Sequence, residues 1–457
     1  MEFVIGIILL LTFFALAYYC IKGYNLMIGF LVITTLWAAL SLIGAAFASP
    51  EFIAANPVLD NKLINILNAV YQTAPEQWGT TLVNICWGAW FGRILMETGI
   101  ASTLIRKTVE LGGDKPIVTV ALLNIVTAII FTAMTGAGPV IAIGVIVLPI
   151  MMSLGIPKAI ALFSFMESVV AGIYLNPVNF AQYRAFHIGV DELPEFTLGW
   201  YASHWGYYAL GISLVVVTVL DIVYLNRAKK SRAWAAQTRG AQPTQDAPLY
   251  TLILPIVPVV LKIAFDFSVI GGFIIGGYLA LFLCGRMKGS FAENCQLVNK
   301  LFYDGVVDTA PLVGFVLTLP MFNEVAKYAS PYFTVVLGNI MPRTELVVII
   351  LFTVLLALSL FRGPMTLVGC GAATLGVLSN VASFSVPFMY AIFVIPTLTG
   401  NVGSCITQSW VAWGIGYTKV ETKDYLKLSI PFLYICGALL YVLTFFTMTG
   451  LGPEWFV

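Results

Sequence analysis

The stretch Thr135-Gly136-Ala137-Gly138-Pro139 (TGAGP) interrupts a long apolar segment, and Asn176-Pro177-Val178-Asn179 (NPVN) follows it. The second half of the chain repeats the construction with Arg362-Gly363-Pro364 (RGP) and Asn401-Val402-Gly403-Ser404 (NVGS). In both halves the offset from the last glycine of the first motif to the asparagine that opens the second is 38 positions. Helix-interrupting segments at corresponding places of two membrane halves are typical of the binding region of a secondary transporter. The pattern therefore predicts a transporter whose binding region lies between these four motifs.

The composition of the chain is that of a membrane protein. Of its 457 residues 60% are hydrophobic and 10% are charged, whereas about a quarter of the residues of a soluble domain are charged. Apolar runs of about 20 residues, enough to cross a bilayer, recur from the beginning of the chain. The formal net charge of +1 argues against nucleic acid as a partner. The seven cysteines lie singly, without metal-ligand or redox spacing, and we expect them to be packing residues.

One long polar segment, residues 227–248, has the composition of a loop and carries several Lys and Arg residues. The positive-inside rule places it in the cytoplasm. It divides the chain into a first half, residues 1–226, and a second half, residues 249–457, which we expect to be inverted repeats. Working outward from this linker places most of the 23 Lys and Arg residues on the cytoplasmic side and both termini outside. The expected location is the inner (cytoplasmic) membrane of a bacterium.

The motifs predict an all-α polytopic membrane protein with inverted-topology repeats. In addition to scaffold helices, we expect two re-entrant hairpins, at about residues 117–153 and 346–378. We also expect two broken transmembrane helices, at about residues 159–185 and 384–412. Non-helical chain persists in lipid only where protein or a water-filled cavity surrounds it, because unsatisfied backbone groups are costly there. We expect a helix to restart at Val140 and at Met365, with free amides at its start. The alternative, in which each pair spans the bilayer twice around an ordinary surface turn, stays open because both arms are long enough.

Free amides and half-helix ends suit the carboxylate of a substrate, whereas freed carbonyls and short polar side chains suit Na⁺. Asn176 and Asn401 are therefore candidate Na⁺ ligands. Arg362 is the first choice for pairing with an anionic substrate, since a guanidinium holds a carboxylate through two hydrogen bonds. Its alternative role is to tie the hairpin tip to neighbouring carbonyls.

Other charged residues lie within or beside apolar runs. Glu167 lies in the middle of a predicted helix and is a candidate coupling carboxylate; the alternative is a structural ion pair with a buried arginine. Arg184 is a candidate substrate-binding residue. Two positions stay open for Arg184 and His187: they line the binding site, or they reach the outer membrane interface. Three pairs spaced about one helical turn apart are interpreted as structural: Arg93 with Glu97, Glu324 with Lys327, and Lys262 with Asp266.

Several segments resemble the ion transporter superfamily, most closely its gluconate, citrate and dicarboxylate permease branches. These are FGRILMETGIASTL (91–104), the tip TGAGPV, LPIMMSLGI (148–156) and YLNPVNFAQ (174–182), with a weaker match in FRGPM and LTGNVGSCITQ. The resemblance implies a homodimer with a scaffold and a mobile transport domain that carries small carboxylates by an elevator-type displacement driven by Na⁺ or H⁺. It places the site at Thr135, Gly138, Asn176, Asn179, Arg362, Gly363, Thr366, Asn401 and Ser404. The first tip lacks the Ser-Asn-Thr triplet of the dicarboxylate branch, which leaves the substrate and a Na⁺ site open.

Together these features predict a secondary active transporter of a small organic anion, such as a sugar acid, citrate or a dicarboxylate, coupled to Na⁺ or H⁺. An anion exchanger, or a Na⁺/H⁺ antiporter with Glu167 as the titrating group, is the alternative. The chain has only two histidines, His187 and His204, and no HExxH or GxSxG pattern, so we expect neither an enzyme nor a cofactor. The expected partners are the substrate, the bilayer and a second copy of the chain.

Overall fold

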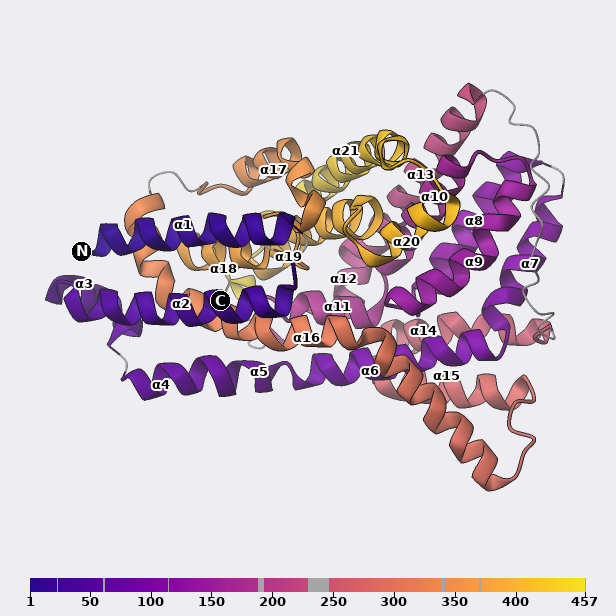
Figure 1. Ribbon diagram of the computed structural model, residues 1–457, viewed down its shortest axis with the longest axis horizontal. Coiled ribbons are helices and arrows are strands. Elements are labelled where there is room, and N and C mark those ends of the chain that lie inside the picture. Colours follow the sequence, from indigo (N-terminus) through magenta and orange to yellow (C-terminus); the bar gives the residue numbers. More distant parts are fainter. Residues whose placement is uncertain are drawn as a thin grey trace.

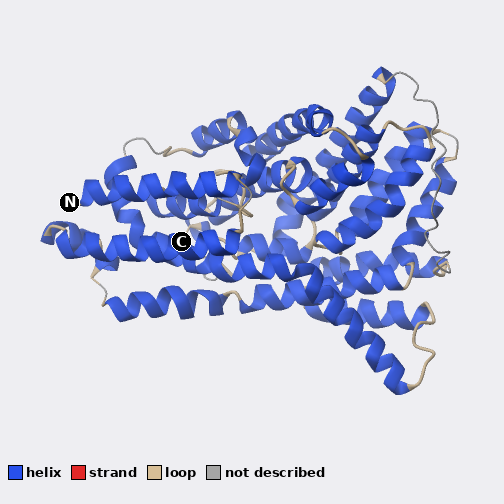
Figure 2. Cartoon of the chain, viewed as in Figure 1, coloured by secondary structure: helices blue, strands red, loops and turns tan. Residues whose placement is uncertain are grey.

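The computed structural model describes residues 1–22, 24–60, 62–113, 115–187, 193–228, 246–338, 342–369 and 371–456. Throughout these ranges the chain forms helices and connecting loops and no strand (Figure 2). Five helical segments of the described chain are long and apolar enough to cross a membrane. Two bent pairs of helices also meet this criterion when each pair is counted as one span. The structure thus confirms the predicted all-α polytopic membrane protein. The predicted linker, 227–248, lies mostly outside the described residues, so its cytoplasmic position stays a prediction.

Helices from the first half of the chain pack against one long helix from the second half. This helix, α16 (Phe291–Leu337), contacts α1 (Glu2–Ile21), α2 (Leu26–Phe47) and α6 (Gly79–Glu97) and runs along much of the molecule (Figure 1). With 47 residues it is more than twice as long as a bilayer crossing requires. A capping box at Ser290 satisfies the first free amides of α16 and defines its start.

The first hairpin consists of α8 (Pro116–Phe131) and α9 (Ala137–Ser153), joined by a short turn. Gly136 in this turn has a φ of 94°, which residues with a Cβ atom rarely adopt. Because α9 already begins at Ala137, the predicted restart at Val140 is wrong. Pro139 instead falls in the first turn of α9, where its missing N–H removes no helical hydrogen bond.

The second hairpin consists of α17 (Glu345–Val354), the 3₁₀ segment η6 (Leu356–Arg362) and α18 (Gly371–Val381), with a 63° bend between α17 and η6. The predicted restart at Met365 is wrong, because α18 begins only at Gly371. The N–H of Leu367 donates a hydrogen bond to a side chain of the second broken helix, Thr397 Oγ1, at 2.9 Å. This long-range contact holds the tip in a non-helical conformation that the local sequence does not show.

Both hairpin tips end inside the protein. Thr135 of the first tip is 4% exposed and Thr366 of the second is completely buried. In Figure 1, α8 and α9 lie in the right half of the molecule and α17 and α18 in the left half, so the hairpins approach the middle from opposite ends. The alternative of ordinary turns at the surface is therefore wrong.

Two helices are broken between these hairpins. α10 (Lys158–Ile173) and α11 (Pro177–Arg184) meet at 69°. α19 (Val386–Ile395) continues into the π-helical segment η7 (Pro396–Ser404), which is buried along its whole length, and α20 (Ser409–Thr418) follows. Both interruptions lie at the predicted NPVN and NVGS motifs, as Pro177 and the glycines of η7 favour.

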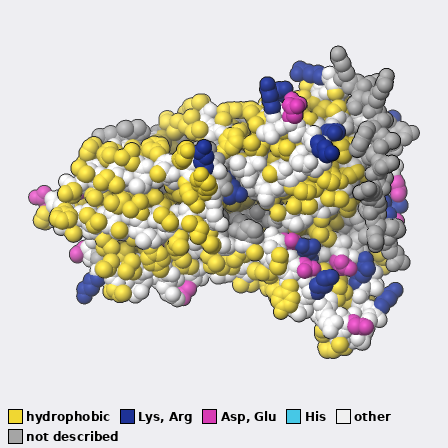
Figure 3. All heavy atoms as spheres, in the orientation of Figure 1, with side chains coloured by type: hydrophobic (Ala, Val, Ile, Leu, Met, Phe, Trp, Pro, Cys, Tyr) yellow, Lys and Arg dark blue, Asp and Glu magenta, His cyan; other side chains and the backbone are white. Residues whose placement is uncertain are grey.

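The other elements complete the helical packing. They are α3 (Pro50–Ala55), η1 (Pro57–Leu59), α4 (Leu63–Asn68), η2 (Ala69–Thr73), α5 (Ala74–Gln77), α7 (Ile100–Gly112), α12 (Leu198–Tyr201), η4 (Ala202–Gly206), α13 (Tyr207–Arg227), η5 (Leu249–Ile256), α14 (Val257–Phe265), α15 (Val269–Leu283), α21 (Thr422–Thr447) and η8 (Pro453–Trp455). α10 lies at the centre and contacts α8, α13, α21 and η7. Hydrophobic side chains are numerous on the visible face over α1 and α2, and few charged ones lie there (Figure 3), as lipid contact requires. The chain is an integral membrane protein.

Candidate functional site

The two hairpin tips and both broken helices meet around a cavity of about 670 Å³, here called the central cavity. A volume of this size accommodates a small organic solute. The first tip contributes Thr135, α11 contributes Asn179, the second tip contributes Arg362, and η7 contributes Val402. The structure therefore brings the four sequence motifs to one place.

Arg362 supplies a positive charge to the central cavity. It has a φ of 58°, an uncommon conformation for a residue with a side chain, and thereby ends η6. No ion pair or hydrogen bond of its side chain is found in the described part of the chain, where Nε is buried without a partner. The alternative role, a tie between the tip and neighbouring carbonyls, therefore has no supporting contact. A guanidinium held among apolar helices without a partner favours an anionic ligand.

Asn176 links the first broken helix to the first hairpin tip. Its Oδ1 accepts the N–H groups of Val178 (2.9 Å) and Asn179 (3.2 Å), which caps α11. Its Nδ2 donates to the carbonyls of Phe131 (3.1 Å) and Met134 (3.0 Å). The side chain is completely buried and does not line the central cavity. In this conformation Asn176 positions its neighbours, and its role as a Na⁺ ligand stays a prediction.

Glu167 of α10 lies against the second helix break. It is completely buried, and Ser404 donates a hydrogen bond from Oγ to Glu167 Oε1 at 3.2 Å. No ion pair joins Glu167 to an arginine within the described chain, so the structure does not support the predicted structural pairing. Oε2 has no hydrogen-bond partner. Burial of a carboxylate without a cation is costly, so the site favours a proton or a metal cation beside Glu167.

Further polar atoms without partners lie near the two second-half motifs. Asn401 in η7 is completely buried, and neither Oδ1 nor Nδ2 has a hydrogen-bond partner in the described structure. The same is true of Thr366 Oγ1 at the second tip. Buried amide and hydroxyl groups are rarely left unsatisfied, and their oxygens are the ligands that hard cations prefer. Neither residue lines the central cavity.

The glycines of the two tips serve close packing. A Cβ atom at Gly363 would overlap the carbonyl oxygen of Leu358, so only glycine fits there. A Cβ atom at Gly138 would overlap the carboxylate of Asp308 on α16. Neither glycine lines the central cavity itself. Both predicted positions therefore shape the tips instead of facing the solute in this conformation.

Asp308 is a cavity residue that the sequence analysis missed. It lines the central cavity and pairs with Arg93 of α6 through two short contacts, Nε to Oδ2 at 2.5 Å and Nη2 to Oδ1 at 2.6 Å. The predicted pairing of Arg93 with Glu97 is therefore wrong, because α16 places a better-oriented carboxylate beside α6. The sequence could have identified Asp308, because acidic residues within apolar membrane helices are rare and commonly mark functional sites.

A second buried acid, Asp221 of α13, was also missed. It is 2% exposed and accepts hydrogen bonds from Asn124 Nδ2 on α8 and Ser164 Oγ on α10, each at 2.8 Å. Ser164 lies one helical turn before Glu167 on the same helix. Polar groups therefore extend from the first hairpin through α10 to the second helix break.

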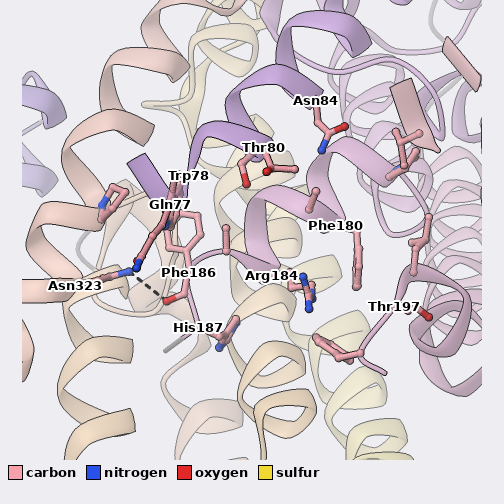
Figure 4. Close-up of a pocket in the computed structure, with 18 of the residues that line it drawn as sticks. Gln77, Trp78, Thr80, Asn84, Phe180, Arg184, Phe186, His187, Thr197 and Asn323 are labelled. Atoms are coloured by element: carbon pink, nitrogen blue, oxygen red, sulfur yellow. Dashed lines mark hydrogen bonds between the residues drawn. The ribbon is translucent and has the colours of Figure 1, made fainter. Parts of the chain in front are cut away.

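The remaining charged pairs are confirmed as structural contacts. Lys327 contacts Glu324 at 2.8 Å, and Lys262 contacts Asp266 at 2.6 Å. The ammonium group of Lys262 donates a hydrogen bond that lowers the pKa of Asp266. Arg184 does not line the central cavity. It lies with His187 in a separate cavity on the other side of α11 (Figure 4).

In this all-helical membrane protein two hairpin tips and two broken helices surround a solute-sized cavity. The chain is similar in structure to the crystal structure of the Alcanivorax borkumensis YdaH transporter, described as having an unusual topology. The TM-score is 0.59 with 14% sequence identity, over 92% of this chain and 98% of that chain. Neither the protein-family models nor the curated protein sequences give a match. The likeness is one of fold.

Proposed function

We propose that this protein is a secondary active transporter that moves a small organic anion, such as a sugar acid, citrate or a dicarboxylate, together with Na⁺ or H⁺. The proposal includes membership of the ion transporter superfamily, a homodimer in the cytoplasmic membrane of a bacterium, and termini on the outer side. The observation that carries it is Arg362, an arginine that faces the central cavity without an acidic partner among the described residues.

The charge balance of the central cavity favours an anion. Its charged lining residues are Arg362 and Asp308. Asp308 is already neutralised by Arg93, at 2.5 and 2.6 Å. Arg362 therefore leaves one uncompensated positive charge, and a carboxylate meets a guanidinium through two charge-assisted hydrogen bonds. Thr135 and Asn179 add a hydroxyl and an amide for the other oxygens of a polar solute.

Cation coupling is proposed from the second helix break. Glu167 is buried with one oxygen unpaired, and Asn401 close by in sequence to Ser404 has an unpaired amide. A proton on Glu167, or a Na⁺ ion held by these oxygens, would remove the cost of the buried charge. The same carboxylate supports the alternative, an anion exchanger or a Na⁺/H⁺ antiporter, in which Glu167 titrates during each cycle.

An elevator-type displacement is proposed from the packing. α8, α9, η7 and α20 pack on α10, whereas α1, α2 and α6 pack on α16, which we take as the scaffold. The second hairpin contacts both groups, because η6 packs on η7 and α18 packs on α16. The Arg93–Asp308 pair connects two scaffold helices and lies against the first hairpin tip at Gly138. Movement of the tip past this pair would carry the central cavity from one side of the membrane to the other.

Uptake into proteoliposomes tests the proposal. We expect the wild-type protein to accumulate at least one of citrate, succinate and gluconate under a Na⁺ or pH gradient, and Arg362→Gln to reduce the uptake rate at least tenfold. Arg343→Gln is the matched control, because Arg343 is exposed, lines neither cavity and donates a hydrogen bond to the Gly338 carbonyl at 3.3 Å. Wild-type uptake by Arg362→Gln, or no gradient-driven accumulation of any organic acid, would overturn the proposed function.

A further inference from the structure

Three buried polar side chains meet where α8, α10 and α13 pack together, in the right half of the molecule (Figure 1). They are Asn124 of α8, Ser164 of α10 and Asp221 of α13, here called the polar cluster, and each is at most 2% exposed. Because α8 is the first arm of the first hairpin, the polar cluster fastens this hairpin to two neighbouring helices.

The polar cluster has more close contacts than hydrogen atoms when Asp221 is ionised. Asp221 Oδ2 lies 2.8 Å from Asn124 Nδ2 and 2.8 Å from Ser164 Oγ, and Ser164 Oγ lies 2.7 Å from Asn124 Oδ1. The amide supplies a hydrogen atom to the first contact, whereas the hydroxyl has a single hydrogen atom for the other two. One oxygen–oxygen contact at hydrogen-bond distance is then left without a proton.

A proton on Asp221 Oδ2 completes the polar cluster. Ser164 then donates to Asn124 Oδ1, and the protonated carboxyl group donates to Ser164 Oγ. Turning the amide over gives the same count. Its oxygen would accept the proton of Asp221, its nitrogen would donate to Ser164, and the hydroxyl would donate to Asp221. In either arrangement all three contacts are hydrogen bonds only when Asp221 carries a proton.

The elements that contact α13 bring no buried cation to Asp221. Within the described chain Asp221 makes no ion pair, and its Oδ1 is buried without a hydrogen-bond partner. A buried carboxylate without a cation is costly and takes up a proton instead. Apart from Asp221, the titratable side chains of α8, α10, α13, α21 and η4 that are at least partly buried are Glu167, Tyr224, Tyr425, Tyr434, Cys436 and Tyr441. The basic side chains of these elements are all exposed: Lys158, His204, Arg227, Lys423 and Lys427.

We propose that Asp221 is a proton-binding site, and that its proton joins the first hairpin to α10 and α13. Release of the proton breaks the O–H bond at Asp221 Oδ2, passes H⁺ to water and leaves a carboxylate whose contacts with the polar cluster are incomplete. α8 is then held less tightly. The inference rests on the proposed function only for the use of this step, where it names H⁺ as a coupling ion and Asp221 as a carrier separate from Glu167.

Infrared spectroscopy detects the proton directly, because a protonated carboxyl group and a carboxylate absorb at different frequencies. Cell-free synthesis with aspartate that carries a heavy carbon isotope in its side-chain carboxyl group separates Asp221 from Glu167. Asp221 is the one buried aspartate among the described residues. At neutral pH we expect a protonated-carboxyl band that shifts with the label, is missing in Asp221→Asn and moves to another frequency in Ser164→Ala. The labelled wild-type protein gives this result without any variant having to fold.

Hydrogen exchange and uptake test what the proton does. Raising the pH until the band disappears should accelerate hydrogen exchange of α8 at least tenfold beyond the intrinsic effect of pH. Asp221→Asn replaces the protonated carboxyl group by an amide of the same shape. It should remove this pH-dependent step and reduce uptake driven by a pH gradient at least tenfold. Asp424→Asn is the matched control and should keep both, because Asp424 is exposed and pairs with Lys427 at 2.7 Å.

The outcomes distinguish this inference from the proposed function. A labelled wild-type protein that shows only carboxylate bands at neutral pH would overturn the proton site and leave the proposed transport standing. A pH-dependent step that persists in Asp221→Asn, or uptake at the wild-type rate in that variant, would overturn the role of the proton. A protonated band and the exchange step in a protein that accumulates no organic acid would support the proton site and contradict the proposed function.

Discussion

Replacing Asn176 with alanine is expected to loosen the first hairpin tip and the first helix break at the same time. The side chain makes four hydrogen bonds, two to the free amides of α11 and two to the carbonyls of Phe131 and Met134. No other contact in the described structure gives α11 a side-chain cap. The variant therefore removes the connection between two of the four motifs that surround the central cavity.

The expected magnitude follows from these bonds. Loss of an N-cap costs about 1 kcal/mol, and each buried carbonyl left without its donor costs about 1–3 kcal/mol. Asn176→Ala should therefore lower the free energy of local opening by about 3–7 kcal/mol. Since about 1.4 kcal/mol is a factor of ten, the lower end of this range corresponds to an acceleration of amide hydrogen exchange in the tip by at least about 100-fold.

Hydrogen-exchange mass spectrometry of the protein in detergent is the assay. The amides of Thr132 and Met134 report on the tip, because they bond to the carbonyls of Ala128 (3.0 Å) and Ile130 (3.2 Å). Asn176→Ser is the matched variant, since serine caps a helix about as well as asparagine but is too short to reach both carbonyls. It should accelerate exchange in the tip and leave the start of α11 protected.

Two results would refute this reasoning. If Asn176→Ala left exchange in the tip unchanged, the bonds to Phe131 and Met134 would contribute nothing to its stability. If Asn176→Ser and Asn176→Ala exposed the start of α11 to the same extent, the capping role would be wrong. Equal acceleration in peptides far from both segments would instead indicate global loosening.

Two further substitutions test other contacts. Glu167→Gln keeps the acceptor for Ser404 and removes the ionisable group, so gradient-driven accumulation should be lost while counterflow exchange of the anion continues; accumulation at the wild-type level in proteoliposomes would exclude Glu167 from coupling. Arg93→Gln and Asp308→Asn should each destabilise the protein by about 2 kcal/mol, because each leaves a partly buried charge without its partner. The double variant should then lose less stability than the two single losses combined, and full additivity of the melting-temperature shifts would contradict a direct pairing.

Short-range features of the sequence accounted for the architecture. Gly136, Pro177 and the RGP motif disturb helical hydrogen bonding wherever they occur, so the interruptions were predictable from the residues themselves. The restart positions were less predictable. Proline is tolerated in a first turn, which allowed α9 to begin at Ala137, and the second tip is held open by Thr397, which lies 30 residues further along the chain.

The sequence by itself determined that this is a helical membrane protein with two interrupted hairpins, two broken helices and an arginine at the second tip. Only the tertiary structure decided the partners of the charged groups. Arg93 meets Asp308 across 215 residues, and Glu167 meets Ser404 across 237. The physical reason is that helix breaking is a property of the local backbone, whereas a buried charge pairs with whatever group the packing of distant helices places within hydrogen-bond distance. The 69° bend between α10 and α11 likewise places Arg184 at the separate cavity and Asn179 at the central cavity.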